Sequence, residues 1–366
     1  MVIVHDFMET LGGAERVTME MALAFPDAPV FAILGRPWVA EGMGVADRFT
    51  SLLPMRKRLL QHYRLLTPAI PTLLRRERLP AADVLLTSSY AFAHRVRTEN
   101  DAPQVCFCHS PLRFAWTMTD RYRSAWAPTP PAGLAFGLMA AAMRRSDRAS
   151  ARNVDLYLTQ AEYTADQIRR FYGREAEIIG APVDCDLFHP SGEPAEDYFL
   201  LCGRLTEPYL GAEPVLEAFR HLDERLVIVG TGPAEAHLRS IAPSNVEFRG
   251  RVGDDELVRL LQHCRALISP TRHDFGLLPI EAMATGRPVL ALGEGGALAT
   301  VVPGVSGEFY RDGSAAGIAA ALRAFDPEAF DVTKIREHAL RWDRRGFRRR
   351  LVEAVERVAG SAGGEG

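Results

Sequence analysis

Two side chains that could hold a polar ligand, His273 and Glu281, stand eight positions apart in TRHDFGLLPIEAMATGRPVLAL (271–292). Between them lie Phe275 and Gly276. A glycine just ahead of a helix exposes backbone N–H groups, which bind anions or hydroxyl groups. The stretch therefore predicts contacts to a polar or anionic ligand.

A plain structural interpretation of the same stretch exists. Pro279 fits the first position of a helix that Gly286 would end, which makes Glu281 a first-turn residue. The helix dipole alone would then stabilise that carboxylate, typically by about 0.3–1 kcal/mol. This interpretation leaves His273 and the Phe-Gly pair without a role, so the ligand-binding interpretation is retained.

The first half of the chain holds two further candidates. LGGAERV (11–17) follows a predicted strand, and Gly12 and Gly13 would let backbone at a helix start approach a ligand. In CFCHSPLRFAW (106–116), His109 ends a buried strand, where open α/β sheets bind ligands. Any tight turn can use glycines, and a lone histidine is more often structural, so neither signal is specific alone.

The second half holds three loops that suit a diphosphate and a base. Arg204 follows Gly203 in a strand-to-helix loop, and a guanidinium can grip two phosphate oxygens at once. FRGRVGDDELVRLL (248–261) offers exposed loop backbone to a flat base, and GEGGALAT (293–300) adds a glycine turn. The residues in these last two stretches that we predict to contact the ligand are Arg251, Val252, Gly295, Gly296 and Ala297.

Buried strands must position these loops. Ten are predicted, at 2–4, 29–34, 84–87, 105–108, 154–159, 198–202, 226–230, 246–248, 266–269 and 288–292. Most are continuous apolar runs separated by amphipathic helical patterns, which is typical of parallel sheets covered on both faces. With 366 residues, the chain suits two doubly wound α/β domains.

The domain boundary is predicted near GAPVDCDLFHPSGEPAEDYF (180–199), which is rich in proline and glycine. We expect Rossmann-like domains over 1–185 and 195–345. A last helix over 346–359 would pack back toward the N-terminal domain, and 360–366 would be a disordered tail.

Composition excludes several classes of protein. A net charge of −3 lacks the basic surplus of a nucleic-acid binder. We expect no signal peptide from the residues at 1–7, and the longest apolar stretch, AGLAFGLMAAAM, is too short to span a bilayer. The five cysteines lie mostly in apolar runs, as reduced thiols in a cytoplasmic protein would. CFCH lacks the second Cys/His pair that zinc needs, so no metal is expected.

One segment is strongly basic. Residues 51–80 carry arginines and a lysine among leucines with the single acid Glu77, as a helix resting on an anionic membrane surface would. A solvated basic face beside core leucines explains the pattern equally well. Because Lys57 and Lys334 are the only lysines in the sequence, we expect any cationic side chain that contacts phosphate to be an arginine.

Five motifs, in order HDFMETLGGAERV, CHSPLRFAW, GRLTEPY, HDFGLLPIEAMATGRPV and GGALATVVPGVSGEFY, together resemble the retaining glycosyltransferases of group 1 (family 4). The resemblance covers nearly the whole chain and is nearest to bacterial O-antigen and exopolysaccharide mannosyltransferases. It implies the GT-B fold, α/β with two Rossmann-like domains facing across a cleft. The N-terminal domain would bind a lipid-linked glycan acceptor. The C-terminal domain would bind a GDP- or UDP-linked hexose, without a metal or other cofactor.

The resemblance also implies residue roles. His273 and Glu281 occupy the E-x7-E positions, with Glu281 on the ribose hydroxyls. Arg204 would neutralise the leaving diphosphate, on which negative charge builds as the sugar–phosphate bond breaks. His109 would lie near the sugar. Backbone contacts to sugar and phosphates would come from Gly12, Gly13, Phe275, Gly276, the adjoining Leu277, and Gly295 to Ala297.

Two positions depart from the family pattern. A lysine expected after Arg204 aligns with Leu210, and the first motif glutamate is His273. Losing one charged donor could cost about 3 kcal/mol of transition-state stabilisation. An active hexosyltransferase, a degenerate protein that binds nucleotide or glycan without efficient turnover, and a nucleotide-sugar epimerase all stay open. The expected location is the cytoplasm, either free or peripheral on the inner face of the plasma membrane.

Overall fold

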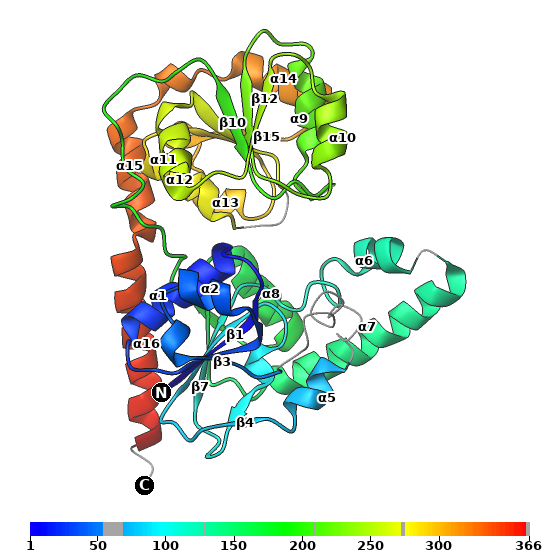
Figure 1. The fold of residues 1–366 in the computed structure, drawn as a ribbon, viewed down its shortest axis with the longest axis vertical. Helices are drawn as coiled ribbons and strands as arrows, with labels where there is room; N and C mark the ends of the chain where they lie inside the picture. Colours follow the sequence, from blue (N-terminus) through cyan, green and yellow to red (C-terminus); the bar gives the residue numbers. More distant parts are fainter. Residues whose placement is uncertain (54–68, 128, 208, 272–274, 364–366) are drawn as a thin grey trace. The chain divides into compact units, whose positions relative to one another are not determined.

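The fold is described from a computed structural model (Figure 1). It describes residues 1–53, 69–127, 129–207, 209–271 and 275–363. The chain divides into two compact units, Met1–Pro182 with Phe347–Gly366, and Val183–Gly346. They are called unit 1 and unit 2 below.

A seven-stranded parallel sheet forms the centre of unit 1, with the order β3-β2-β1-β5-β7-β8-β9. The strands are β1 (Val2–Met8), β2 (Val30–Gly35), β3 (Phe49–Ser51), β5 (Leu85–Ser89), β7 (Gln104–Cys108), β8 (Leu156–Thr159) and β9 (Ala176–Ile178). The short strands β4 (Arg78–Leu79) and β6 (Arg97–Thr98) pair separately. From β1 the chain adds β2 and β3 on one side of that strand, and then returns to add β5, β7, β8 and β9 on its other side. The direction in which strands are added therefore reverses between β1 and β5.

Helices cover both faces of this sheet. The helices of this unit are α1 (Gly13–Ala24), α2 (Pro37–Gly42), α5 (Ile70–Leu74), α6 (Thr119–Trp126), α7 (Pro130–Ala151), α8 (Glu162–Tyr172) and α16 (Arg344–Gly363), with the 3-10 turns η1 (Ala46–Arg48) and η2 (Ala93–Arg95). Successive side chains of a strand point to opposite faces. Ile3 accordingly packs with α1 and α16, and Val2 and Val4 pack into the core that includes Phe136 of α7. Figure 1 shows α6 and α7 extending away from the sheet of unit 1.

Unit 2 contains a six-stranded parallel sheet with the order β12-β11-β10-β13-β14-β15. Its strands are β10 (Phe199–Cys202), β11 (Leu226–Val229), β12 (Val246–Gly250), β13 (Ala266–Ser269), β14 (Val289–Leu292) and β15 (Gly307–Tyr310). Its helices are α9 (Ala212–Phe219), α10 (Glu235–Ile241), α11 (Asp254–His263), α12 (Leu277–Ala284), α13 (Ala297–Thr300), α14 (Ala315–Ala324) and α15 (Val332–Ala339), with η3 (Pro327–Ala329) and η4 (Leu340–Trp342). Two doubly wound α/β units, as predicted, are therefore confirmed.

The unit boundary falls at Pro182/Val183, within the loop-rich stretch named above. Cys185 and Phe188 are buried in the core of unit 2, which explains why the residues after Pro182 belong there. At the other end, Phe347 and Leu351 of α16 are fully buried in a core of unit 1. The helix continues to Gly363 rather than ending at 359.

Four further features of the sequence can be compared with the described residues: the basic segment, apolar helices, metal-binding groups and the cysteines. Most of the basic segment, residues 54–68, lies outside the described residues. No helix among the described residues is both long and apolar enough to cross a membrane. Likewise, the described residues contain no group of three His, Cys, Asp or Glu side chains arranged to hold a metal ion. All five cysteines are free thiols.

A buried carboxylate on α7 fixes that helix in unit 1. Asp147 is fully buried and accepts hydrogen bonds from Arg95, the Trp116 indole and the Tyr172 hydroxyl, all at 2.8 Å. His94 Nε2 lies 3.2 Å from the same carboxylate. Burial alone would raise the pKa of Asp147, but the hydrogen bond and charge of His94, with Arg95 and Trp116, outweigh it and hold the pKa below its ordinary value of 3.8.

This shift makes a prediction about acid stability. A carboxyl whose pKa is lower in the folded state stabilises the fold above the unfolded value and loses that contribution as the pH falls toward the folded one. We therefore expect the free energy of unfolding, measured in urea, to fall as the pH drops below about 3.8. The Asp147→Asn variant should show a shallower fall over this range. Parallel pH profiles for the two proteins would contradict this role for Asp147.

Candidate functional site

The predicted ligand-binding residues of unit 2 follow the carboxyl ends of neighbouring strands. The sheet order reverses between β10 and β13, because the chain runs from β10 outward to β12 and then returns to β13 beside β10. Open α/β sheets bind ligands at this kind of switch point. Gly203 and Arg204 follow β10, and Gly276 lies in the connection after β13. The topology thus places these two loops side by side.

Arg204 is free to meet a ligand. Its side chain is exposed, and within the part of the chain that the structure describes it pairs with no carboxylate. The loop beneath it is fixed, because Gly203 N donates to Val229 O at 3.0 Å and Leu205 N donates to Thr231 O at 3.1 Å. The backbone therefore holds the base of Arg204 while the guanidinium stays available.

Two glycines that the sequence analysis missed make this close packing possible. A Cβ on Gly230 would lie 1.9 Å from the Gly203 carbonyl oxygen, and one on Gly232 would lie 2.2 Å from the Leu205 carbonyl oxygen. Gly230 also has a φ of +129°, which other residues rarely adopt. The pattern VGTG after an apolar strand was the available signal.

The variant Gly230→Ala tests this packing. We expect it to lower the free energy of unfolding by about 3 kcal/mol, because the methyl group must displace the Gly203 loop or distort β11. Gly250→Ala is the matched control. Gly250 has a φ of +68° but nothing within 4 Å of a new Cβ, so only the backbone cost of about 1 kcal/mol applies. Urea denaturation checks both, and equal losses would contradict the close-packing argument.

The neighbouring loop after β12 offers a second unpaired arginine. Arg249 Nε lies 2.7 Å from a Glu247 carboxylate oxygen, whereas exposed Arg251 has no acidic partner among the described residues. Val252 is half-buried against the core of unit 2. Of these two arginines, Arg251 is therefore the one that could supplement Arg204.

The helix after β13 starts earlier than predicted. α12 begins at Leu277, with Gly276 as its N-cap at a φ of +69°, so the predicted start at Pro279 is wrong. Glu281 consequently lies beyond the first turn, with only 5% of its surface exposed. The helix-dipole explanation for this carboxylate is weakened, because the dipole acts mainly within the first turn. Gly286 follows the end of the helix, as predicted, and has a φ of +79°.

The remaining predicted residues of unit 2 fall into three groups. Phe275 and Leu277 are half-buried against the core. His273 lies outside the described residues. Gly295 has a φ of +61°, Gly296 is the N-cap of α13, and Ala297 opens that helix. This glycine turn follows β14, the strand next to β13.

Leu210, which aligns with the family's lysine, is a core residue. It is 4% exposed and packs in the cluster that includes Leu205 and Val215. Its loop is closed by Glu207, whose carboxylate accepts hydrogen bonds from the backbone N–H groups of Gly211 and Ala212 at 3.2 and 2.6 Å. The loop is therefore built around an apolar anchor at this position.

In unit 1, His109 follows β7 and is held from several sides. Its backbone N–H donates to Ser89 O at 2.8 Å, and the Gln160 amide donates to its carbonyl at 2.8 Å. Its Nε2 lies 2.8 Å from Ser88 Oγ. Burial, with smaller contributions from His5 and Arg113, lowers its pKa well below 6.5. His109 is therefore a neutral imidazole at pH 7.

A buried polar network lies behind His109. His5 Nδ1 on β1 is 2.9 Å from both Thr18 Oγ1 and Ser88 Oγ. β1 and β5 are the strands at which the order of this sheet reverses. Sequence reasoning did not identify His5 or Ser88, because the bond between them joins residues far apart in the chain.

The Gly12–Gly13 loop has a structural use as well. The Gly12 N–H donates to a Glu15 carboxylate oxygen at 3.0 Å, which caps α1. The Gly12 N–H is therefore paired within the protein in this structure, and its contact to a ligand stays a prediction. Gly13 is the first residue of α1, so its backbone lies at the helix N-terminus.

Asp6, next to His5, is another residue that the sequence analysis missed. Its carboxylate is fully buried and accepts hydrogen bonds from four successive backbone N–H groups, those of Tyr90 to Ala93, at 2.6 to 2.7 Å. It therefore fixes the loop after β5, directly following Ser88 and Ser89.

Known proteins match both halves of the chain. The profile described as glycosyl transferases group 1 matches residues 196–325, and that described as Glycosyltransferase Family 4 matches residues 11–187. The Anabaena protein HepE, solved in complex with UDP, superposes with a TM-score of 0.70 at 17% identity over 97% of this chain and 100% of its own. The chain belongs to the glycosyltransferases of group 1 and family 4 and has their GT-B fold.

Two curated relatives share parts of the sequence. The O-antigen chain mannosyltransferase C of Escherichia coli is 32% identical over 26% of this chain and 28% of its own. The GDP-mannose-dependent monoacylated alpha-(1-6)-phosphatidylinositol monomannoside mannosyltransferase of Corynebacterium glutamicum is 26% identical over 44% of this chain and 50% of its own. The chain spans about half or less of the length of the curated relatives it matches.

The predicted residues thus gather at one sheet edge in each unit. Gly13 and His109 lie in unit 1, and Arg204, Arg251, Gly276, Glu281 and the glycine turn at 295–297 lie in unit 2. That the two edges share one cleft, and that each residue has the role the resemblance implies, stay predictions.

Proposed function

We propose that the protein transfers a hexose, with mannose the first candidate, from a GDP- or UDP-linked donor to a lipid-linked or polysaccharide-precursor acceptor. Transfer would retain the anomeric configuration and need no metal. The reaction would take place in the cytoplasm, at the inner face of the plasma membrane.

The observation that carries this proposal is the switch point of unit 2. It places the fixed Gly203–Arg204 loop beside the connection that leads to Gly276 and α12. Breaking a sugar–phosphate bond leaves negative charge on a nucleoside diphosphate. Arg204, backbone N–H groups and Arg251 could stabilise that charge, which is the task a metal ion performs in other enzymes.

The sugar and the acceptor are argued from the relatives. Both relatives described above are named mannosyltransferases, one is named GDP-mannose-dependent, and its named acceptor is a phosphatidylinositol glycolipid. Neutral His109 could accept or donate one hydrogen bond to the sugar, while Glu281 could hold the ribose.

Donor binding tests the proposal first. A donor present at a hundred times its Kd stabilises the fold by about 2.7 kcal/mol, which raises Tm by roughly 5 to 10 °C for a domain of this size. GDP-mannose, UDP-glucose and their nucleotides should be compared by thermal denaturation. Turnover of the shifting donor is then measured with membrane lipid extracts as acceptor, in the presence and absence of EDTA. A panel with no shift, or transfer abolished by EDTA, would contradict the proposal.

A degenerate protein that binds without efficient turnover is the second candidate. The buried position of Leu210 favours it, because the cation expected there by resemblance is replaced by a core side chain. Stabilisation by a donor without any transfer or donor hydrolysis would support this alternative. Conversion of the donor alone to an epimer would instead indicate an epimerase.

A further inference from the structure

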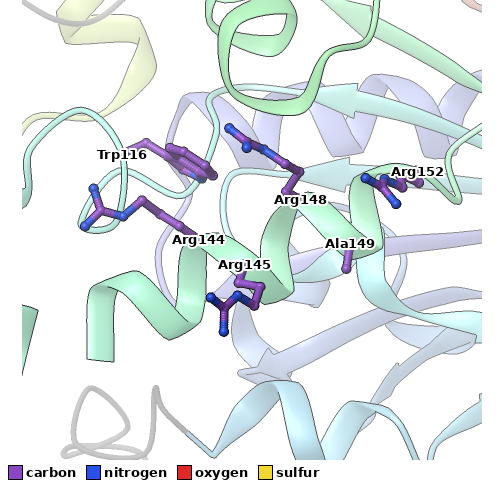
Figure 2. Close-up of a pocket in the computed structure, with 6 residues that line it drawn as sticks. All are labelled: Trp116, Arg144, Arg145, Arg148, Ala149 and Arg152. Carbon is purple, nitrogen blue, oxygen red and sulfur yellow. The ribbon is translucent and has the colours of Figure 1, made fainter. Parts of the chain in front are cut away.

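A basic pocket lies in unit 1, mainly on α7, a helix that carries none of the predicted site residues. Its volume is about 440 Å³, and it is lined by Trp116, Arg144, Arg145, Arg148, Ala149 and Arg152. Figure 2 shows the side chains of Arg144, Arg145 and Arg148 projecting from the C-terminal part of α7, that of Arg152 from the residue after it, and the Trp116 ring beside Arg148.

The aromatic wall of the pocket is held rigidly. The Trp116 indole donates to Asp147 at 2.8 Å, and its ring stacks on Phe171 with the centroids 4.8 Å apart. The Arg148 guanidinium lies 5.3 Å from the Trp116 ring centroid, and its Nε donates to Phe171 O at 2.8 Å. Asp147 is itself fixed by Arg95. The wall formed by Trp116 and Arg148 is therefore held in place by the protein itself.

The charge of the pocket is not balanced from within. No acidic side chain lines it. Among the residues that the structure describes, no carboxylate pairs with Arg144, Arg145 or Arg152. Guanidinium groups bind phosphate oxygens in pairs and lose less hydration than ammonium groups. Four arginines around one cavity therefore suit a ligand with at least two negative charges, such as a phosphate monoester or a diphosphate.

The same helix offers apolar side chains to a hydrocarbon. Leu134 and Leu138 of α7 are 69% and 67% exposed. They stand eleven and seven residues before Arg145, which places all three on one face of the helix. At 1.5 Å per residue, Leu138 lies about 10 Å along the axis from Arg145. This length suits a molecule with a phosphate group and an attached acyl or prenyl chain.

We propose that the pocket binds the phosphate or diphosphate group of a membrane lipid, while Leu134 and Leu138 contact its hydrocarbon. This inference rests on the proposed function in one respect: it identifies the chemistry by which a lipid-linked acceptor is held. It differs from the predicted membrane contact through residues 51–80, because it assigns a defined cavity on α7.

Vesicle binding tests the inference without donor, acceptor sugar or turnover. The full chain is sedimented with vesicles of phosphatidylcholine alone and of phosphatidylcholine with phosphatidic acid, a lipid whose headgroup is a phosphate monoester. We expect binding to the anionic vesicles only. R145Q/R152Q should lower this affinity about thirtyfold, because each arginine at an anionic surface contributes about a factor of five. R311Q/R341Q is the matched control, since it removes two exposed arginines from unit 2, and it should change affinity less than twofold.

A second double variant distinguishes binding of a lipid from binding of a soluble phosphate. L134S/L138S should weaken vesicle binding about tenfold, yet leave binding of inorganic diphosphate unchanged by calorimetry. R145Q/R152Q should weaken both. Diphosphate binding without vesicle binding would overturn the lipid assignment. Equal losses of vesicle affinity in R145Q/R152Q and R311Q/R341Q would contradict the proposal that this pocket is the binding site. If transfer fails while these results hold, the proposed function fails and the lipid site stands.

Discussion

Replacing Arg204 by glutamine is expected to lower kcat about 100- to 1,000-fold with little change in KM. Removing one donor that meets charge developing in a transition state typically costs about 3 to 4 kcal/mol. The guanidinium is exposed and pairs with no carboxylate in the described part of the chain, so its loss leaves no buried charge behind. The fold should therefore be unaffected, and the effect should appear in catalysis alone.

Steady-state kinetics with the donor found by thermal shift would measure this effect. Arg311→Gln is the control, because Arg311 is also an exposed arginine of unit 2, and its kcat should match the wild type. Arg204→Lys should recover only part of the loss, since an ammonium group cannot bind two oxygens in the same fork. A full recovery by lysine, or a kcat unchanged in Arg204→Gln, would show that the leaving diphosphate is stabilised elsewhere.

Variants of Arg204 and Arg251 show whether both arginines stabilise the leaving group, and whether the protein turns over at all. If Arg204 and Arg251 share the charge of the leaving group, each single variant should reduce kcat, and the double variant should reduce it further. If Arg204 acts alone, Arg251→Gln should leave kcat unchanged. A protein with no measurable turnover in any of these forms would be the degenerate binder that the buried Leu210 allows.

The strands were predictable because their chemistry is local. All ten predicted strands are present, since a continuous apolar run is typical of a strand buried on both faces. Their ends shift by at most two residues, except in β1, which continues from the predicted end at residue 4 to Met8. The strands that were missed, β3, β4, β6, β9 and β15, are two to four residues long. So few residues show no periodicity, and their pairing partners decide their conformation.

Residues of the candidate site could be predicted from the sequence only where the residue type itself indicates a function. A glycine before an arginine at the end of a strand identified the loop of Arg204. By contrast, Gly230 is required by the Gly203 carbonyl, and His5 is paired with Ser88 across two strands. Those constraints belong to the folded sheet. The start of α12 was misjudged because Pro279 tolerates any position in the first turn, whereas the left-handed Gly276 sets the boundary.

The same distinction applies to Asp6, a buried residue of unit 1 whose carboxylate accepts four backbone hydrogen bonds. Its neighbours in the sequence give no sign of its role, since the four N–H groups it binds lie 84 to 87 residues away. These bonds join β1 to the loop after β5, at the reversal of the sheet. The loop ends in η2, where His94 and Arg95 approach Asp147. Two buried carboxylates thus act on one loop.

Asp6→Ala should therefore lower the free energy of unfolding by about 4 kcal/mol. Four buried N–H groups would lose a charged acceptor, and an unsatisfied buried donor costs about 1 to 3 kcal/mol before the loop relaxes. Asp6→Asn should be nearly as damaging, because its amide nitrogen would face two donors. Urea denaturation measures both, with Asp101→Asn as control, since Asp101 is exposed and its carboxylate pairs with the surface arginines Arg78 and Arg97. An asparagine at position 6 as stable as the wild type would mean that the loop holds its conformation without the carboxylate.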